Sequence, residues 1–146
     1  MRIRLTITVL VAGLLLCSCG PTAEVLYYWG GESDGVTEYE RLAYRSSDKQ
    51  SPESVCAMLV MYEKLVSNPG GYRQVPPPGI CAEYGWLLVQ PETAAAFEEH
   101  ASASQRRILG SSEQFRERGR KLFEMEMNYY PESVVFLGPL AKKLFR

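Results

Sequence analysis

The sequence is poor in the side chains from which metal and catalytic sites are most often built. It has one histidine, His100, and four cysteines in 146 residues. A structural zinc site needs four good ligands, often with cysteines in Cys-x-x-Cys pairs, and the chain has no such pair. We therefore expect no metal site and no cofactor.

The sequence also lacks a recognisable catalytic group. His100 follows Glu98 and Glu99, either of which could form an acid–base pair with it. However, adjacent residues on a helix do not face one another, and no nucleophile stands at a recognisable turn. We expect His100 to be exposed on a short helix, and we expect the protein not to be an enzyme.

The sequence has no long run of basic residues. The 16 lysines and arginines are balanced by 17 acidic residues, and 46% of all residues are hydrophobic. These values are ordinary for a globular protein, whereas nucleic-acid binding needs a clustered basic surface. We expect a single globular domain and no nucleic-acid partner.

The longest apolar stretch lies at the N-terminus. Leu5 to Leu16 form a stretch of 12 residues that follows Arg2 and Arg4 and is too short to span a bilayer. A basic start followed by an apolar core of this length is typical of a secretion signal. The sequence therefore predicts that residues 1–18 are a cleaved signal peptide.

The end of this segment resembles the lipobox of bacterial lipoproteins, in which a leucine stands three positions before an invariant cysteine and a small residue directly before it. Cys19 fits this pattern, with Leu16 and Ser18 as the residues that the signal peptidase recognises. Cys17 fits badly because Leu16 would occupy the small position. The alternative is an ordinary secretion signal with two incidental cysteines. The resemblance implies lipid on Cys19, and two or three acyl chains would hold the protein on a membrane.

Residues 19–25 would then be a short tether between the lipid and the domain. Gly20 is not the aspartate that is associated with retention in the inner membrane of enterobacteria. We therefore expect the protein in the cell envelope, lipid-anchored in the outer membrane and facing the periplasm. A surface-exposed orientation is the alternative.

Hydrophobic spacing predicts that residues 26–146 form one all-α domain, and no segment has a convincing strand pattern. Val36, Tyr39 and Ala43 recur at helical spacing from about Ser33. Pro139 either starts or kinks the last helix. The predicted helices begin at about residues 33, 52, 80, 91, 102 and 111, with a last one near the C-terminus, and a loop is expected at 46–50.

Two cysteines remain in the domain, Cys56 and Cys81. Both lie near the starts of successive predicted helices, which in an antiparallel hairpin stand at opposite ends. A disulfide needs Cα atoms within about 7 Å of one another. We therefore favour two buried free thiols over a disulfide.

Aromatic side chains are the candidates for partner binding. Tyr27, Tyr28 and Trp29 follow the tether directly, where they either pack on the domain or dock to a partner. Tyr84 belongs to the inward stripe of its predicted helix. Trp86 neighbours that stripe without sharing it, which is an argument for exposure of its ring. Buried packing is nevertheless the favoured expectation, and exposure is the alternative.

Two predicted helices resemble the two helices of a tetratricopeptide repeat, in which small residues let the helices approach closely. Tyr84-Gly85 and Leu88 match the first helix, and Gly119, Phe123 and Pro131 match the second. The resemblance is interrupted, because residues 91–112 would be an insertion. It also departs at Glu126, where the repeat usually has a small residue.

The whole mature chain resembles a family of small bacterial lipoproteins that is catalogued as a domain of unknown function. Its members carry a tetratricopeptide-like hairpin and tend to be encoded beside lipoproteins similar to the curli-production assembly component. The resemblance implies a non-catalytic interaction or assembly role in the cell envelope, with another envelope lipoprotein as the partner. The alternative is a carrier of a small apolar ligand or a surface-exposed binding protein.

Overall fold

A computed structural model describes residues 24–49 and 51–146. The predicted signal peptide, its recognition residues Leu16 and Ser18, and the lipidation residue Cys19 lie outside the described residues. The same holds for all of the tether except its last two residues.

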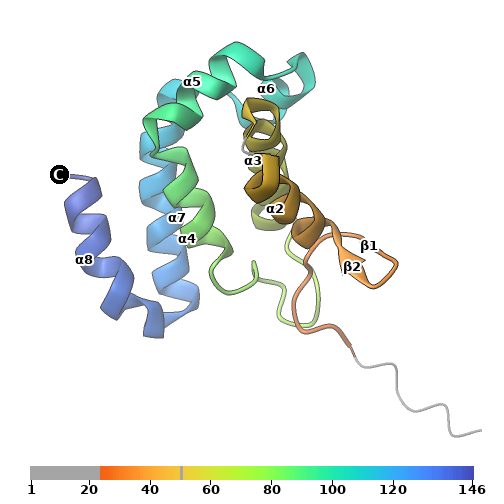
Figure 1. The fold of residues 1–146 in the computed structure, drawn as a ribbon. Helices are drawn as coiled ribbons and strands as arrows, with labels where there is room; N and C mark the ends of the chain where they lie inside the picture. The colour runs from red at the N-terminus through yellow and green to blue at the C-terminus, as the bar shows by residue number, and fades with distance from the viewer. Residues whose placement is uncertain (1–23, 50) are drawn as a thin grey trace, which may run out of the picture.

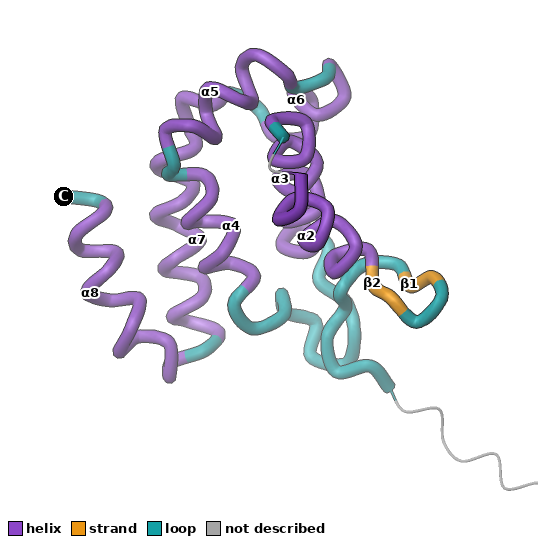
Figure 2. The backbone as a smooth tube through the Cα atoms, in the orientation of Figure 1, coloured by secondary structure: helices purple, strands orange, loops and turns teal. Residues whose placement is uncertain are grey.

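The described chain is built almost entirely of helices, which confirms the predicted all-α class (Figures 1 and 2). One two-stranded antiparallel hairpin, β1 (Glu32–Ser33) with β2 (Val36–Thr37), precedes them. Short 3-10 turns, η1 (Ser112–Gln114) and η2 (Pro131–Ser133), introduce the last two helices. The helices are α2 (Glu38–Lys49), α3 (Pro52–Ser67), α4 (Ile80–Leu88), α5 (Pro91–His100), α6 (Ala103–Leu109), α7 (Phe115–Tyr129) and α8 (Val134–Leu144).

The hairpin corrects the prediction that a helix begins near Ser33. Asp34 and Gly35 have φ angles of 56° and 75°, and positive φ at both positions is what a two-residue hairpin turn of type I′ requires. Helix α2 begins only after Thr37, whose hydroxyl accepts from the backbone N–H of Glu40, while the Glu40 carboxylate accepts from the backbone N–H of Thr37. This capping box fixes the start of the helix. The loop predicted at 46–50 was also wrong, because α2 continues to Lys49.

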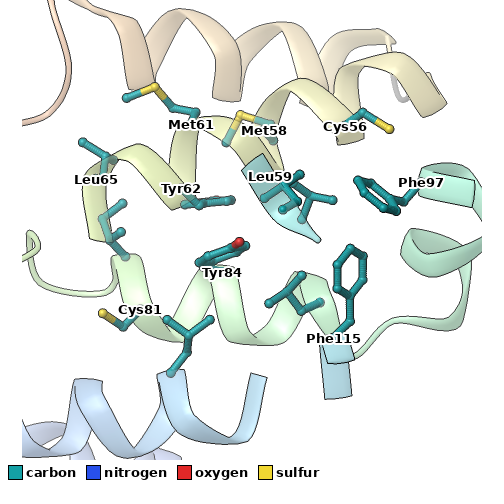
Figure 3. Close-up of a cluster of buried hydrophobic side chains, with 14 residues drawn as sticks. Cys56, Met58, Leu59, Met61, Tyr62, Leu65, Cys81, Tyr84, Phe97 and Phe115 are labelled. Atoms are coloured by element: carbon teal, nitrogen blue, oxygen red, sulfur yellow. The ribbon is translucent and has the colours of Figure 1, made fainter. Parts of the chain in front are cut away.

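The helices form two groups, α2 with α3 and α4 with α7 and α8, and α5 and α6 connect the two groups (Figure 1). Helix α3 packs on α2, α4, α5 and α6, while α4 and α7 pack along one another as an antiparallel pair. Helix α8 lies outside α7. The core fills the space between α3, α4 and α7, and α5 adds Phe97 against Phe115 with ring centroids 5.0 Å apart (Figure 3).

Cys56 and Cys81 are both free and fully buried, which confirms the preference for two thiols over a disulfide. Figure 3 shows them at opposite ends of the core. The physical reason is the one expected from the sequence, since successive antiparallel helices place their first turns far apart. Burial raises the pKa of the Cys81 thiol to about 12.

The closest approach of α4 and α7 occurs at two glycines. A Cβ atom at Gly119 would lie 2.7 Å from Cγ1 of Val89 and 2.9 Å from the carbonyl oxygen of Gly85. A Cβ atom at Gly85 would lie 2.7 Å from the Phe123 ring. The two helices are therefore in contact at a distance that only glycine permits.

Candidate binding groove

A series of aromatic rings runs from the segment after the tether into the core. The ring centroids of Trp29 and Tyr39 of α2 are 5.3 Å apart, and those of Tyr39 and Tyr62 of α3 are 6.1 Å apart. Tyr62 stacks on Tyr84 of α4 with a centroid distance of 5.5 Å. Aromatic pairs at these separations are each worth about 0.5–1.5 kcal/mol beyond their buried area. The series thus ties three helices and the N-terminal segment together.

At the inner end of the series, the charge of a carboxylate is balanced by a cation. The Tyr84 hydroxyl donates to the Glu63 carboxylate at 2.8 Å, and the Arg118 guanidinium pairs with the same carboxylate. Arg118 also lies over the Tyr84 ring, 5.6 Å from its centroid. A carboxylate, a phenol and a cation therefore satisfy one another here. Tyr84 is fully buried, so its ring is not available to a partner.

The middle of the series carries a second carboxylate, that of Glu83. The hydroxyls of Tyr39 and Tyr62 both donate to Oε2 of Glu83, at 2.6 Å and 2.9 Å. Burial, together with the charge of Glu83, raises the pKa of both phenols above its ordinary value, so they remain neutral donors. Among the residues described by the structure, no ion pair includes Glu83.

Glu83 lies in a groove of about 480 Å³ between α2, α3 and α4. This volume is within the usual range of ligand sites. Serines 46 and 47 of its lining come from α2, and Trp86 comes from α4. The residues that line the groove are Tyr39, Ala43, Ser46, Ser47, Met58, Tyr62, Glu83, Trp86 and Leu87.

The expectation that Trp86 is buried was wrong. Its side chain is 46% exposed. The inward stripe of α4 is made by Cys81, Tyr84, Gly85 and Leu88, which are buried. Trp86 is one residue past Gly85, about 100° further around the helix, and therefore faces the groove.

The three aromatic residues after the tether contact different parts of the domain. The ring centroid of Tyr27 lies 6.3 Å from that of Tyr130, and the Tyr27 hydroxyl accepts a hydrogen bond from Arg73 at 3.1 Å. Tyr28 packs against Gly70, and Trp29 joins the aromatic series. All three are half-buried. Their main contacts are therefore within the chain.

The other repeat-like residues lie at the α4–α7 interface or at its end. Leu88 and Phe123 are buried, and Pro131 opens η2 directly after α7. Glu126, the departure from the repeat pattern, is buried and 2% exposed. Its carboxylate accepts from backbone N–H groups at the start of α4, where the N-cap Gly79 has no side chain to do so.

Sequence reasoning missed the part that Tyr39, Tyr62 and Glu83 play in the groove. The sequence identifies Tyr39 only as a member of a helical stripe. Glu83, Trp86 and Leu87 are spaced i, i+3 and i+4, which puts the three on one helix face. That signal could have identified the α4 wall of the groove.

The described residues contain no group of three or more histidine, cysteine, aspartate or glutamate side chains placed to hold a metal ion. His100 is exposed, with Nδ1 3.3 Å from Glu53 and Nε2 3.7 Å from Glu99. None of the helices in residues 24–49 and 51–146 is both long and apolar enough to cross a membrane.

Comparison with known proteins gives no relative from which a function could be carried over. No family model matches the chain, and neither a curated protein nor a solved structure matches it.

Proposed function

We propose that the chain is a lipid-anchored, non-catalytic interaction module of the bacterial cell envelope, and that a partner protein docks in the groove. The observation that carries the docking role is the groove itself, whose lining includes both the exposed Trp86 and Glu83. Tryptophan and tyrosine are common anchors of interfaces because they supply large, rigid area at low entropic cost.

The anchoring role rests on the lipobox formed by Leu16, Ser18 and Cys19. In this proposal lipid on Cys19 holds the domain at the outer membrane, facing the periplasm. The tether of residues 19–25 keeps the groove near the membrane surface. By the family resemblance, the partner is another envelope lipoprotein of the curli-production assembly kind.

We further infer that α4 and α7 form a tetratricopeptide-like pair. The glycines that face one another, Gly85 and Gly119, support this inference, as does the end of α7 just before Pro131. Helix pairs of this kind present concave surfaces on which peptides bind. Helices α5 and α6 would be the inserted segment, which packs back on α3.

A second candidate function is the carriage of a small apolar ligand. One observation favours it, namely that about 480 Å³ is enough for such a molecule. The carboxylate of Glu83 disfavours it, because an apolar ligand would remove water from that charge without replacing it. Binding of a fluorescent fatty acid that Trp86→Ala abolishes would support this alternative.

The anchor is tested by growing cells with radioactive palmitate. The wild-type protein is expected to carry the label and to sediment with membranes, whereas Cys19→Ser is expected to do neither. An unlabelled wild-type protein would contradict the anchoring role.

The docking role is tested by photo-crosslinking in intact cells. A benzophenone amino acid is placed at position 47, where exposed Ser47 lines the groove, and at position 72 as the matched control, because Tyr72 is 74% exposed and lies outside the groove. We expect one envelope protein to be crosslinked from position 47 but not from position 72, and to be lost in Cys19→Ser. Identical products from both positions would contradict docking in the groove.

A further inference from the structure

We propose that the groove binds the cationic end of a lysine or arginine side chain from the partner protein, with the charge on Glu83 and the side chain against Trp86. This inference rests on the proposed docking function and adds the chemistry that the groove selects.

The first argument is a repeated arrangement between α3 and α4. Tyr62 and Glu63 are neighbours on α3, and Glu83 and Tyr84 are neighbours on α4. Each tyrosine donates to the glutamate of the other helix, Tyr62 to Glu83 at 2.9 Å and Tyr84 to Glu63 at 2.8 Å. The two rings stack between these hydrogen bonds, with planes 17° apart (Figure 3).

The two halves of this arrangement differ in one respect. Glu63 is neutralised by Arg118, which comes from α7 and lies over the Tyr84 ring. Glu83 has no such cation among the described side chains, and only its Oε2 accepts hydrogen bonds, from Tyr39 and Tyr62. Among the described residues, a guanidinium thus completes the arrangement at Glu63, whereas no cation completes the same arrangement at Glu83.

The second argument is the chemistry of the groove wall. A cation beside an indole or phenol face is attracted by the ring, and tryptophan is the strongest of the aromatic residues in this respect. Lysine and arginine also have long apolar stems, which would cover Met58 and Leu87 while the charged end reaches Glu83. A basic side chain therefore matches both the apolar and the charged parts of the lining.

The third argument concerns the source of the cation. Trp86, which lines the groove, is 46% exposed, whereas pockets for small ligands usually bury most of the ligand, so the groove suits a small free amine poorly. A side chain that belongs to a protein segment gains further contact area, because its neighbours can reach polar lining residues such as Ser46 and Ser47. The occupant we infer is therefore a basic residue within a polypeptide.

The experiment is a parallel selection from a library of random peptides on the purified wild-type protein and on Glu83→Gln. Glutamine keeps the size of the side chain and an oxygen that can accept from both tyrosines, and circular dichroism checks that the variant is folded. Glu92→Gln, at an exposed acid of α5 outside the groove, is the matched control.

We expect the wild-type protein and Glu92→Gln to enrich peptides that have lysine or arginine at one fixed position, and Glu83→Gln to lose this preference. Replacing that basic residue of a selected peptide with norleucine is expected to weaken binding to the wild-type protein roughly tenfold, and binding to Glu83→Gln hardly at all.

If wild-type and Glu83→Gln proteins select the same peptides, or if the selected peptides show no basic preference, the inference is wrong while docking in the groove stands. If neither protein enriches any peptide, the docking function fails as well.

Discussion

At the scale of single residues, Glu126 caps the start of α4. Its buried carboxylate accepts from the backbone N–H groups of Gly79 at 2.7 Å, Cys81 at 3.1 Å and Ala82 at 3.4 Å. Substitution Glu126→Ala would leave these donors without an acceptor and open a cavity. We expect the free energy of unfolding to fall by about 2–4 kcal/mol, measured by urea denaturation. A fall of less than about 0.5 kcal/mol would contradict this role.

The charge of Glu126 should also make the stability depend on pH. Burial raises the pKa of this carboxyl above its usual value of 4.5, against the lowering effect of its backbone hydrogen bonds. The folded protein then keeps a proton that the unfolded chain has already lost. Its contribution to stability is therefore fully present below the unfolded pKa and is lost as the pH rises through the folded pKa.

The reference for this effect is Glu126→Gln, in which all other titrating groups are retained. We expect the wild-type protein to lose stability relative to this variant as the pH rises above about 4.5. The measurement is the difference in unfolding free energy between the two proteins at a series of pH values. A difference that stays constant, or that moves the other way, would show that burial does not control this carboxyl.

At the scale of elements, the α4–α7 pair depends on the two glycines that face one another. Alanine at Gly119 would gain helix propensity but would force its methyl group against Val89 and the backbone of Gly85. Crowding of this kind typically costs about 1–3 kcal/mol. We expect Gly119→Ala to lower the free energy of unfolding by about that amount, as judged by thermal and urea denaturation.

Gly138 is the matched control, because it also lies inside a helix but in an open place. A Cβ atom there would meet only Val134 Cγ1, at 3.9 Å. We expect Gly138→Ala to change the stability by less than about 1 kcal/mol. Equal losses in the two variants would mean that the cost at Gly119 does not come from the close helix contact.

Most helix boundaries could be predicted because local chemistry sets them. Ser51 caps α3 by accepting from the backbone N–H of Ser54, and Pro52 and Pro91 occupy first turns. The prediction failed near Ser33, where the Asp34-Gly35 turn outweighed the helical spacing of Val36. The sequence allows Pro139 either to start or to kink the last helix, and the structure places it inside α8 rather than at its start.

At the scale of the whole molecule, the groove could not be read from the sequence. Its central hydrogen bond joins Tyr39 to Glu83, 44 positions apart, and forms only because α2, α3 and α4 meet. Periodicity correctly assigned Tyr39 to a helix. It does not report which polar group a hydroxyl meets when two helices pack, so neither the carboxylate nor the open side of the groove was foreseen.

Helix α8 is held only loosely by the rest of the molecule. None of its residues is buried, and Val135 and Phe136 are 73% and 78% exposed. Its end is fixed to α7 by Phe145, whose ring lies 5.7 Å from that of Phe123. Local opening follows from few buried apolar contacts. We therefore expect amide hydrogens of α8 to exchange with solvent faster than those of α4 and α7.

The substitution Phe145→Ala tests whether this ring contact holds α8 on α7. It removes the ring that contacts Phe123 and over which Arg116 lies at 5.8 Å, and it leaves the core between α3, α4 and α7 unchanged. We expect faster exchange in α8 with unchanged exchange in α3, measured by mass spectrometry. If exchange accelerates equally in both helices, α8 is part of the cooperative core, and its exposed apolar residues do not mark a separately opening element.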